Sequence, residues 1–547
     1  MTDARKPQTP VAGQIASRGL AVGPVHIVAE GRERRRTQGD AAQEAAALRD
    51  ATARAARDLG GLIEAQADDE AAAILEVQLA LLEDDGLTEG AFEAIAGGAP
   101  AERAWRDALD AQIRDYEAAD DEYFRARATD LADLRDRVLD HLFGSGPAAV
   151  SPCPTGAIVV VDDLTPSRFL DLDWTVCGGL ALSRGSPTSH VAMLARARGV
   201  PMLTGLGPLS LERGGIVILD AEAGRLEPAP TARRLREAAG RIADAEARRA
   251  KENTHLARPA VTADGVAVSV LVNLEELGQL DALDPAICDG IGLLRTEFLF
   301  SSARALPSEE AQYAAYVRFL DWAAGRPVTI RTLDAGGDKP VPGLTPEDEA
   351  NPFLGVRGIR LSLRHRDVFE VQLRALARAA AGACGPLGVM FPMVTTPAEF
   401  VLARTIFEDV IAGLAADGVA AARPAIGMMV EVPAAAIRIA DFDADFYSIG
   451  SNDLIQYVLA CSRDNAALRD MFDGGDPAVV ELIARTVAHG RATGRSVSLC
   501  GDMAGDADAL DLLLGCGLRA FSVAPAVIGR IKAAIAATRL AGEGGHG

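Results

Sequence analysis

The second half of the chain repeats one hydrophobic pattern. From Val261 onward, short apolar runs alternate with amphipathic segments of helical length. The runs with the length of buried strands cover residues 266–273, 290–297, 327–334, 387–394, 426–433, 445–453, 496–502 and 519–525. Eight such strands that alternate with helices over about 290 residues predict a (β/α)8 barrel of the TIM type.

The first half of the chain has a different pattern. From about Asp40 to Phe143, Ala, Leu, Glu and Arg recur with helical periodicity and without a strict heptad. This pattern predicts a bundle of about four helices rather than a coiled coil. Expected within it are a long helix over 39–66, a second helix over 68–86 that Gly86 ends, a break at 97–100 and a third helical run over 101–144.

Strand-like runs lie on both sides of the predicted bundle. One run covers residues 13–30, and later runs cover 156–163, 175–183, 200–206 and 214–228. Because the first run has no partner within the helical segment, we expect it to join the later strands in one small α/β unit. The all-α bundle is then an insertion into a discontinuous domain.

These patterns predict a multidomain α/β protein, since 547 residues are too many for a single hydrophobic core. Residues 231–253 are helical and highly charged, which is typical of a solvated linker helix. The expected domain boundaries are 1–33 plus 144–230 for the α/β domain, 34–143 for the bundle, 231–258 for the linker and 259–547 for the barrel.

Polar side chains gather where the predicted barrel strands end, which is where such barrels carry their chemistry. The sequence places there Arg295 and Glu297, Arg331 and Asp334, the loop residues Asn351, Arg357 and Arg360, then Glu431, Asn452, Asp453, Arg463 and Cys500. A single arginine at such a position usually forms a surface ion pair. Several arginines that converge on one mouth indicate an anion site.

The residue types indicate the ligand expected at this mouth. Guanidinium groups bind phosphate and carboxylate through paired hydrogen bonds. Glu431 and Asp453 form a partial oxygen cage of the kind that Mg²⁺ completes with water and substrate phosphate. A buried cysteine is usually inert, but Cys500 at a strand end can protonate a developing enolate. The mouth therefore predicts a site for a small phosphorylated carboxylate held on Mg²⁺.

A lone histidine in the first half is the second candidate. His190 follows Thr188 and Ser189 and opens a short apolar stretch. Thr188 or Ser189 is expected to cap a helix over 190–198. His190 would then lie at a helix N-terminus, where the positive end of the dipole helps to hold a phosphate. A lone histidine is more often structural, so this interpretation depends on the anion site elsewhere in the chain.

Composition narrows the partners and the compartment. The net charge is -22 and the pI is about 4.8, which disfavours nucleic acid and anionic membranes and suits a basic protein partner. The sequence has no signal-peptide pattern and no apolar run of membrane-spanning length. Its seven cysteines are dispersed without Cys-x-x-Cys spacing, which is typical of reduced thiols. We therefore expect a cytoplasmic protein without membrane insertion.

Several motifs resemble those of enzymes that use phosphoenolpyruvate. Residues 188–203 resemble the phosphohistidine motif, and the segments that resemble the phosphoenolpyruvate-binding barrel are 289–300, 330–339, 351–360, 427–436, 448–457 and 499–506. Pyruvate phosphate dikinase, phosphoenolpyruvate synthase and enzyme I of the sugar phosphotransferase system share both parts. The domain order is that of enzyme I, and the chain has neither room nor motif for the nucleotide-binding domain of the ATP-using relatives. It therefore resembles the phosphoenolpyruvate-protein phosphotransferases, the enzyme I family, over nearly its whole length.

The resemblance implies a role for each candidate residue. His190 is the phosphorylated nucleophile, and Thr165 can hydrogen-bond it. In the barrel, the resemblance implies that the phosphate is bound by Arg295, Arg331 and Arg357, and that Mg²⁺ is bound by Glu431 and Asp453. Asn452 and Arg463 would contact the phosphate and carboxylate ends of the substrate. Cys500 would protonate the pyruvate enolate.

The implied reaction passes the phosphoryl group from phosphoenolpyruvate to His190 and then to a histidine of the carrier HPr, with release of pyruvate, as the first step of sugar uptake. The helical insert resembles the HPr docking surface, and its acidic stretch 68–85 would face the basic partner. The resemblance also implies a homodimer through the barrel. The nitrogen-related branch of the family is the alternative; an ATP-dependent enzyme and a silent regulatory scaffold are disfavoured.

Three positions depart from the family pattern. Ser186 follows Gly185 where the family has a second glycine, so this position has lost the freedom to take a positive φ. Asp502 follows Gly501 where the family usually has glutamate, so the carboxylate has a shorter reach toward the strand-end thiol. Gln78 stands where some relatives have a histidine.

Overall fold

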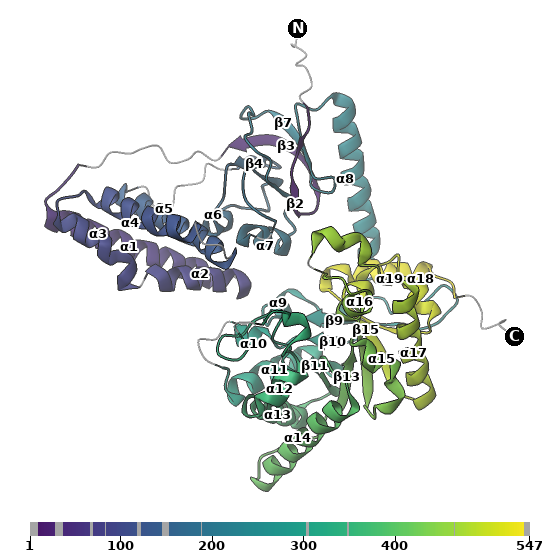
Figure 1. Ribbon diagram of the computed structural model, residues 1–547. Coiled ribbons are helices and arrows are strands. Elements are labelled where there is room, and N and C mark those ends of the chain that lie inside the picture. The colour runs from purple at the N-terminus through teal and green to yellow at the C-terminus, as the bar shows by residue number, and fades with distance from the viewer. Residues whose placement is uncertain are drawn as a thin grey trace. The chain divides into compact units, whose positions relative to one another are not determined.

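Strands from two distant parts of the sequence build one eight-stranded sheet, in the order β1-β8-β7-β3-β4-β5-β6-β2 (Figure 1). Its strands are β1 (Val11–Ala12), β2 (Gln14–Ser17), β3 (Leu20–Ile27), β4 (Ile158–Val161), β5 (Gly179–Leu182), β6 (Met202–Thr204), β7 (Ile216–Asp220) and β8 (Arg225–Pro228). Strand β3 pairs in parallel with β4 and antiparallel with β7. The N-terminal strands therefore complete the later sheet, as the sequence predicted.

The protein is represented by a computed structural model, which describes residues 9–27, 37–65, 69–82, 84–117, 122–144, 153–187, 189–301, 306–337, 339–346, 349–463 and 465–540. The chain divides into two units, residues 1–246 and 247–547. The sheet and the helical insert belong to the first unit, and the barrel belongs to the second.

In the part of the chain that the structure describes, five helices lie between β3 and β4, namely α1 (Ala41–Ala65), α2 (Asp69–Leu82), α3 (Asp85–Ala96), α4 (Ala101–Glu117) and α5 (Glu122–Leu142). They share one core around Trp105, which is fully buried and donates its indole N–H to the Arg135 carbonyl at 3.1 Å. An all-α bundle inserted into an α/β domain confirms this part of the predicted fold class. The four predicted domain boundaries remain predictions.

Two details of the bundle differ from the sequence expectation. Helix α2 ends at Leu82, and Gly86 lies in the first turn of α3 instead of ending a helix. The reason is Asp84, which caps α3 by accepting the Gly86 N–H at 2.9 Å. The run expected over 101–144 consists of two helices, α4 and α5, and residues 118–121 between them lie outside the described residues.

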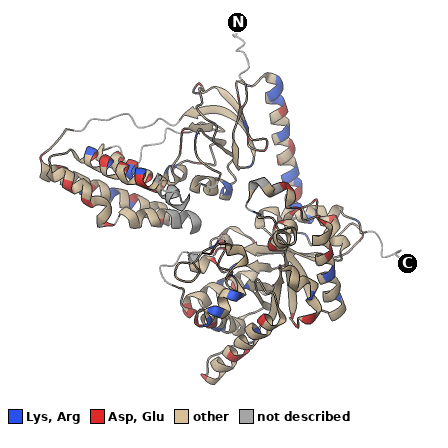
Figure 2. Ribbon diagram, in the orientation of Figure 1, with Lys and Arg blue, Asp and Glu red and all other residues tan. Residues whose placement is uncertain are grey.

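The first unit also holds α6 (Pro166–Leu170), α7 (His190–Ala197) and the start of α8 (Ala232–Asn253). Helix α8 is the predicted linker helix, and charged residues follow one another along it (Figure 2). Its first half is tied to the β7–β8 hairpin, because Arg234 pairs with Glu227 at 3.0 Å and Arg241 with Asp220 at 2.7 Å. Its second half is mostly exposed.

The second unit is a closed barrel in the order β10-β11-β12-β13-β14-β15-β16-β9, and all neighbouring pairs are parallel. Its strands are β9 (Ser269–Leu274), β10 (Ile291–Leu294), β11 (Val328–Arg331), β12 (Leu387–Phe391), β13 (Ala425–Val430), β14 (Phe446–Gly450), β15 (Ser496–Cys500) and β16 (Ala520–Val523). Each coincides with one of the eight predicted runs, so the TIM-type barrel is confirmed.

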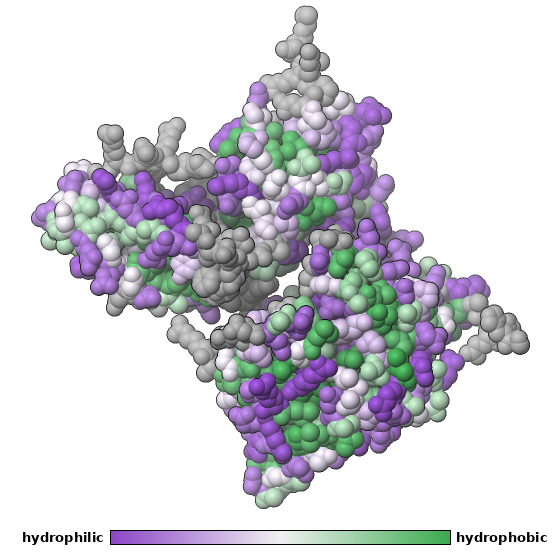
Figure 3. All heavy atoms as spheres, viewed as in Figure 1, coloured by the Kyte–Doolittle hydropathy of each residue, from purple (hydrophilic) through white to green (hydrophobic). Residues whose placement is uncertain are grey.

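Helices and loops surround the barrel. The helices are α9 (Gln279–Ala282), α10 (Phe298–Ser301), α11 (Glu309–Ala323), α12 (Ile359–Arg364), α13 (Arg366–Gly382), α14 (Pro397–Ala416), α15 (Pro433–Ile437), α16 (Ser451–Leu459), α17 (Pro477–Thr493), α18 (Leu510–Gly515) and α19 (Ile528–Ala537). Among the helices described, none is both long and apolar enough to cross a membrane. Hydrophilic and hydrophobic residues are mixed on the visible face of each unit (Figure 3).

Phe446, the first residue of β14, fills the barrel interior between β12 and β13. A Cβ at Gly388 would lie 2.9 Å from its ring and a Cβ at Gly427 only 2.6 Å, so both strands need glycine at these points. The same ring packs against a small apolar cluster formed by Leu293, Met390, Met429 and Cys500. Three of these four side chains also line the cavity at the strand ends.

Candidate active site

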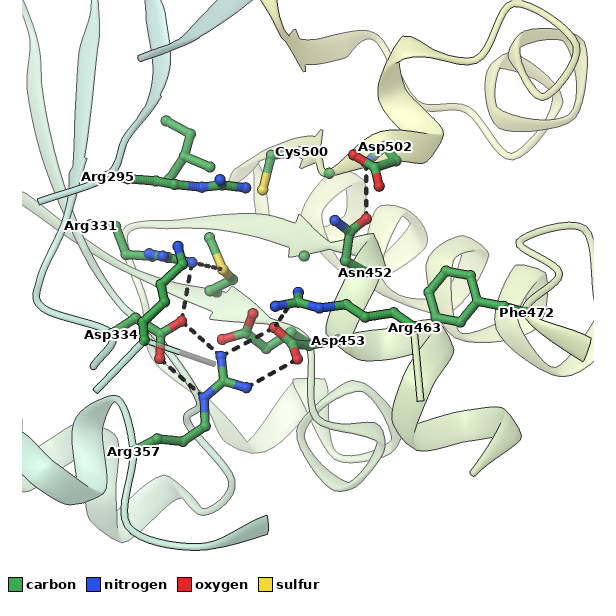
Figure 4. A pocket seen from close by; sticks show the side chains of 16 residues that line it. Arg295, Arg331, Asp334, Arg357, Asn452, Asp453, Arg463, Phe472, Cys500 and Asp502 are labelled. Carbon is green, nitrogen blue, oxygen red and sulfur yellow. Dashed lines mark hydrogen bonds and ion pairs between the residues drawn. The ribbon is translucent and has the colours of Figure 1, made fainter. Parts of the chain in front are cut away.

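A cavity of about 500 Å³ opens at the C-terminal ends of the barrel strands (Figure 4). It is lined by Leu293, Arg295, Arg331, Asp334, Lys339, Arg357, Met429, Glu431, Gly450, Asn452, Asp453, Arg463, Phe472, Cys500, Gly501 and Asp502. The structure therefore brings together every barrel residue for which a site role was predicted. Because cationic and anionic side chains alternate around the cavity, it suits a ligand that carries anionic groups next to a cation.

Arg295 and Arg331 follow the neighbouring strands β10 and β11, and both reach into the cavity (Figure 4). Arg331 lies 3.0 Å from Glu297 and 3.3 Å from Asp334, while Arg295 pairs with Glu275. In the part of the chain that the structure describes, the Nε atoms of both arginines are buried without a hydrogen-bond partner. A buried donor without a partner costs free energy, so an anion that accepts these bonds would be stabilised.

Arg357 lies between two carboxylates of the cavity wall. Its Nη2 is 2.9 Å from Asp334 Oδ2, and its Nη1 is 3.2 Å from Asp453 Oδ1. Burial alone raises the pKa of Asp334, but the charges of Arg331 and Arg357 outweigh it and lower that pKa to about 2. Asp334 is therefore ionised and fixes both guanidinium groups in place.

Glu431 and Asp453 present their carboxylates to the cavity from the ends of β13 and β14. Burial, followed by repulsion from Asp453 and Asp334, raises the pKa of Glu431 to about 8. Oxygen Oε1 of Glu431 accepts the Met393 N–H at 2.5 Å, which directs the carboxyl group. A divalent cation with a preference for oxygen would relieve the repulsion, so this pair of donors fits Mg²⁺.

The protein itself supplies only a few of the ligands of such a metal site. Among the described residues, no group of three or more His, Cys, Asp or Glu side chains is arranged to hold a metal ion. Mg²⁺ commonly binds through one or two carboxylates and takes its other ligands from water and substrate phosphate. Glu431 and Asp453 agree with that mode of binding.

Cys500 ends β15, and its side chain is only 2% exposed. Burial raises the pKa of its thiol, which is therefore protonated at neutral pH. The Ser448 hydroxyl donates to Sγ at 3.6 Å, and Sγ donates to the Ile449 carbonyl at 3.5 Å. The carboxylate of Asp502 was expected to have a short reach toward this thiol. The backbone N–H of Asp502 donates to Asn452 Oδ1 at 2.9 Å.

Among the charged and aromatic residues that line the cavity, Lys339 and Phe472 were missed by the sequence analysis. Lys339 reaches the cavity from the loop after β11, with Nζ 3.6 Å from Glu297 Oε2. A lysine shortly after a polar strand end was the available signal. Phe472 lines the opposite side of the mouth near Arg463 (Figure 4). No signal in the sequence pointed to it, because an isolated Phe in a loop is most often a packing residue.

Three residues expected at the mouth, Glu297, Asn351 and Arg360, do not line the cavity, and Glu297 instead pairs with Arg331. Arg360 is absent from the cavity lining, and its guanidinium holds the Leu354 and Gly355 carbonyls at 3.2 Å each. Asn351 precedes the short 3-10 helix Pro352–Leu354, where its carbonyl accepts the Leu354 N–H at 2.9 Å. Both residues hold the loop instead of lining the cavity, because the loop needs partners for its own backbone groups.

Helix α7 in the first unit begins at His190. Ser189 caps it, since its hydroxyl accepts the Ala192 N–H at 3.3 Å. The expected alternative cap, Thr188, lies outside the described residues. His190 is therefore at a helix N-terminus, with a side chain that is 30% exposed. A helix N-terminus offers unpaired N–H groups and a positive dipole end to an incoming phosphate.

The turn before His190 tolerates the loss of the second glycine. Gly185 takes a φ of 92°, whereas Ser186 is not among the residues with a positive φ. The first glycine therefore supplies the turn by itself. Thr165, expected to hydrogen-bond the histidine, has a buried hydroxyl for which the described residues provide no partner.

A buried polar network connects His190 to the helical insert. His190 Nδ1 lies 3.6 Å from Asp130 Oδ1 on α5. The Gln78 amide on α2 donates to Asp130 at 3.3 Å and to Asp133 at 3.1 Å, and the Ser167 hydroxyl donates to Asp133 at 2.6 Å. Gln78, noted for replacing a histidine, is thus a donor that joins two carboxylates. The sequence analysis did not single out Asp130, because its contact with His190 joins residues that are 60 positions apart in the chain.

Comparisons with known proteins cover both units of the chain. Residues 249–540 match the family model of the PEP-utilising enzyme, PEP-binding domain, residues 12–127 match its N-terminal domain and residues 153–224 its mobile domain. A phosphoenolpyruvate-protein phosphotransferase of Haloferax volcanii is 42% identical over 86% of this chain and 82% of that protein. One of Geobacillus stearothermophilus is 37% identical over 94% and 90%.

A multiphosphoryl transfer protein of Rhodobacter capsulatus is 40% identical over 84% of this chain, which covers 56% of that protein. The three family models and the first two relatives cover both units. The barrel with its anion cavity and the mobile domain are those of a PEP-utilising enzyme, and the chain belongs to the phosphoenolpyruvate-protein phosphotransferase family.

Proposed function

We propose that this chain transfers the phosphoryl group of phosphoenolpyruvate to its own His190 and then to a histidine of the carrier HPr, with release of pyruvate. One observation carries the proposal. Buried arginine N–H groups that have no partner among the described residues, a repelling carboxylate pair and a protonated thiol meet in one cavity. Each of the three matches a different part of phosphoenolpyruvate chemistry: the phosphate, the divalent cation and the enolate.

The substrate's anionic groups account for the arginines. In the proposed complex the phosphate accepts hydrogen bonds from Arg295 and Arg331, whose Nε atoms are otherwise buried and unpaired. Arg463, 21% exposed at the mouth, takes the carboxylate end, and Asn452 contacts the phosphate end. Arg357 stays with its two carboxylates and provides positive potential from the wall.

Glu431 and Asp453 would hold Mg²⁺ in this cavity, which the Glu431–Asp453 repulsion favours. When bound, the ion neutralises charge on the phosphoryl oxygens. Arg295 and Arg331 add to that neutralisation from fixed positions, so little reorganisation is needed during transfer.

His190 accepts the phosphoryl group. Because Nδ1 faces Asp130, we assign Nε2 as the attacking nitrogen. The Nε2–P bond forms while the bond between phosphorus and the enol oxygen breaks, and the product is an enolate. The proposal requires His190 of the first unit to enter the cavity of the second during turnover.

Cys500 completes the reaction in the cavity. Its thiol proton passes to C3 of the enolate, which gives pyruvate and leaves a thiolate that regains a proton from water. A thiol with a raised pKa is suited to this step, because it is still protonated when the enolate forms.

The acceptor and the setting are also proposals. We propose HPr as the acceptor, sugar uptake as the process, the cytoplasm as the compartment and a dimer through the barrel as the assembly. The acidic sequence stretch 68–85 and the net charge of -22 support a basic partner. Leu82 of α2 packs in the bundle core and is not available to that partner.

The test is a coupled assay in which lactate dehydrogenase reports pyruvate. With phosphoenolpyruvate, Mg²⁺ and HPr, we expect continuous pyruvate formation and phosphorylated HPr. Without HPr, we expect pyruvate formation to stop after a single turnover. ATP in place of phosphoenolpyruvate should label nothing. Labelling that needs ATP would indicate a dikinase-type enzyme, and no labelling from either donor would indicate a scaffold.

A further inference from the structure

Phe353 lies between two arginines of the cavity. The guanidinium carbon of Arg357 is 5.7 Å from the centre of the Phe353 ring, and that of Arg463 is also 5.7 Å from it. Both distances are within the range of cation–π attraction. One aromatic ring therefore contacts a cation of the cavity wall and the cation proposed to bind the substrate carboxylate.

Tyr457 fixes the backbone that carries this ring. Its hydroxyl donates to the Phe353 carbonyl at 2.6 Å and accepts from Arg357 Nη1 at 3.4 Å. Burial raises the pKa of Tyr457 to about 12, so the hydroxyl keeps the proton that it donates. Tyr457 lies on α16, the helix that also carries Asp453 and Asn452.

Further contacts keep the ring in one orientation. Gly337, at a φ of 67°, lies so close that a Cβ there would be 3.2 Å from the ring. Arg360 fixes the backbone that follows the ring by holding the Leu354 and Gly355 carbonyls at 3.2 Å. The aromatic face is therefore preorganised before any ligand enters.

The Phe353 ring restricts the orientations of the Arg463 guanidinium, whose Nη1 is 3.9 Å from Asp453 Oδ2. Ordering an arginine side chain on an anion costs side-chain entropy, and that cost weakens affinity. A fixed ring beneath the guanidinium lowers this entropic cost.

We propose that Phe353 is a positioning residue for the substrate, acting through Arg463, and that Tyr457 holds Phe353 in place. The inference rests on the proposed function, since it assigns Arg463 to the carboxylate of phosphoenolpyruvate. Phe353 is not among the residues that line the cavity, so its loss should affect binding of the substrate more than the chemical steps.

The test compares Phe353→Leu, Phe353→Tyr and Tyr457→Phe in the full chain. We expect Phe353→Leu to raise KM for phosphoenolpyruvate by roughly 5- to 30-fold with kcat within about twofold. Phe353→Tyr retains the aromatic face and should restore most of the affinity, and Tyr457→Phe should have an intermediate effect. Leu354→Ala, a change at the 65% exposed neighbour, is the matched control and should leave KM unchanged.

A second readout does not depend on activity. In the wild type, the ring current of Phe353 should shift the Nε–H resonances of Arg357 and Arg463, and Phe353→Leu should remove both shifts. An active wild type with an unchanged KM in Phe353→Leu, or unshifted arginine resonances, would overturn the inference. A wild type that forms no pyruvate would instead refute the proposed function, and the resonances would still decide the contact.

Discussion

Glu431 is the residue whose protonation depends most directly on what fills the cavity. Its folded-state pKa is about 8, whereas the ordinary value is 4.5. Between these values the folded protein binds the proton more tightly than the unfolded chain does. Without a cation, the stability of the barrel should therefore fall as pH rises through this window and remain low above pH 8.

Replacing this carboxyl group by an amide removes the penalty. We expect metal-free Glu431→Gln to be more stable than the wild type by about 1–3 kcal/mol near pH 9, with a smaller difference near pH 6. Urea unfolding in the presence of a chelator measures this difference in the free energy of unfolding. Asp502→Asn, a change at an exposed end of the same cavity, is the control. A gain that is equal at both pH values would contradict the assigned electrostatic cause.

Cys500 gives a second prediction at the residue scale. Cys500→Ala should lower steady-state pyruvate formation by about 100-fold or more, because the thiol that is proposed to protonate C3 is lost. The lactate dehydrogenase assay measures this rate. Cys384→Ala, at an exposed cysteine outside the cavity, is the control. Unchanged turnover in Cys500→Ala would remove the proposed role of the thiol.

At the scale of elements, α5 of the insert and α7 of the α/β domain meet at Asp130 and His190. Asp130→Asn keeps an acceptor for Gln78 but removes the charge beside Nδ1. We expect the single-turnover rate of His190 phosphorylation to fall roughly tenfold, with KM for phosphoenolpyruvate unchanged. Quenched-flow labelling measures it, and Asp136→Asn further along α5 is the control. A rate equal to the wild type would exclude a role for Asp130 in orienting the histidine.

The elements most readily predicted were those with a strong sequence signal. The barrel strands are buried on both faces, so they read as continuous apolar runs, and the polar residues that follow them mark the mouth. Side-chain direction had no such signal. Arg360 shares a motif with Arg357, yet one holds a loop and the other lines the cavity. The Asp130–His190 contact depends on tertiary packing, which periodicity does not report.

At the scale of the whole molecule, the proposed function requires a histidine of one unit to react in the cavity of the other, and a basic partner to bind an acidic chain. The second association is the one that salt should weaken. Raising ionic strength should increase KM for HPr several-fold, mostly through slower association, because exposed charges are screened. Steady-state assays over a salt series measure it, with KM for phosphoenolpyruvate as the internal comparison. A KM for HPr that does not change with salt would contradict an electrostatic docking surface.

The most direct test of the central claim is the site of phosphorylation. The full chain is incubated with phosphoenolpyruvate and Mg²⁺, without HPr, and its mass and modified peptide are determined under conditions that preserve phosphohistidine. We expect one phosphoryl group per chain on His190, none in His190→Ala and normal labelling in the control His255→Ala. An unmodified wild type, or a phosphoryl group on any other residue, would contradict the account.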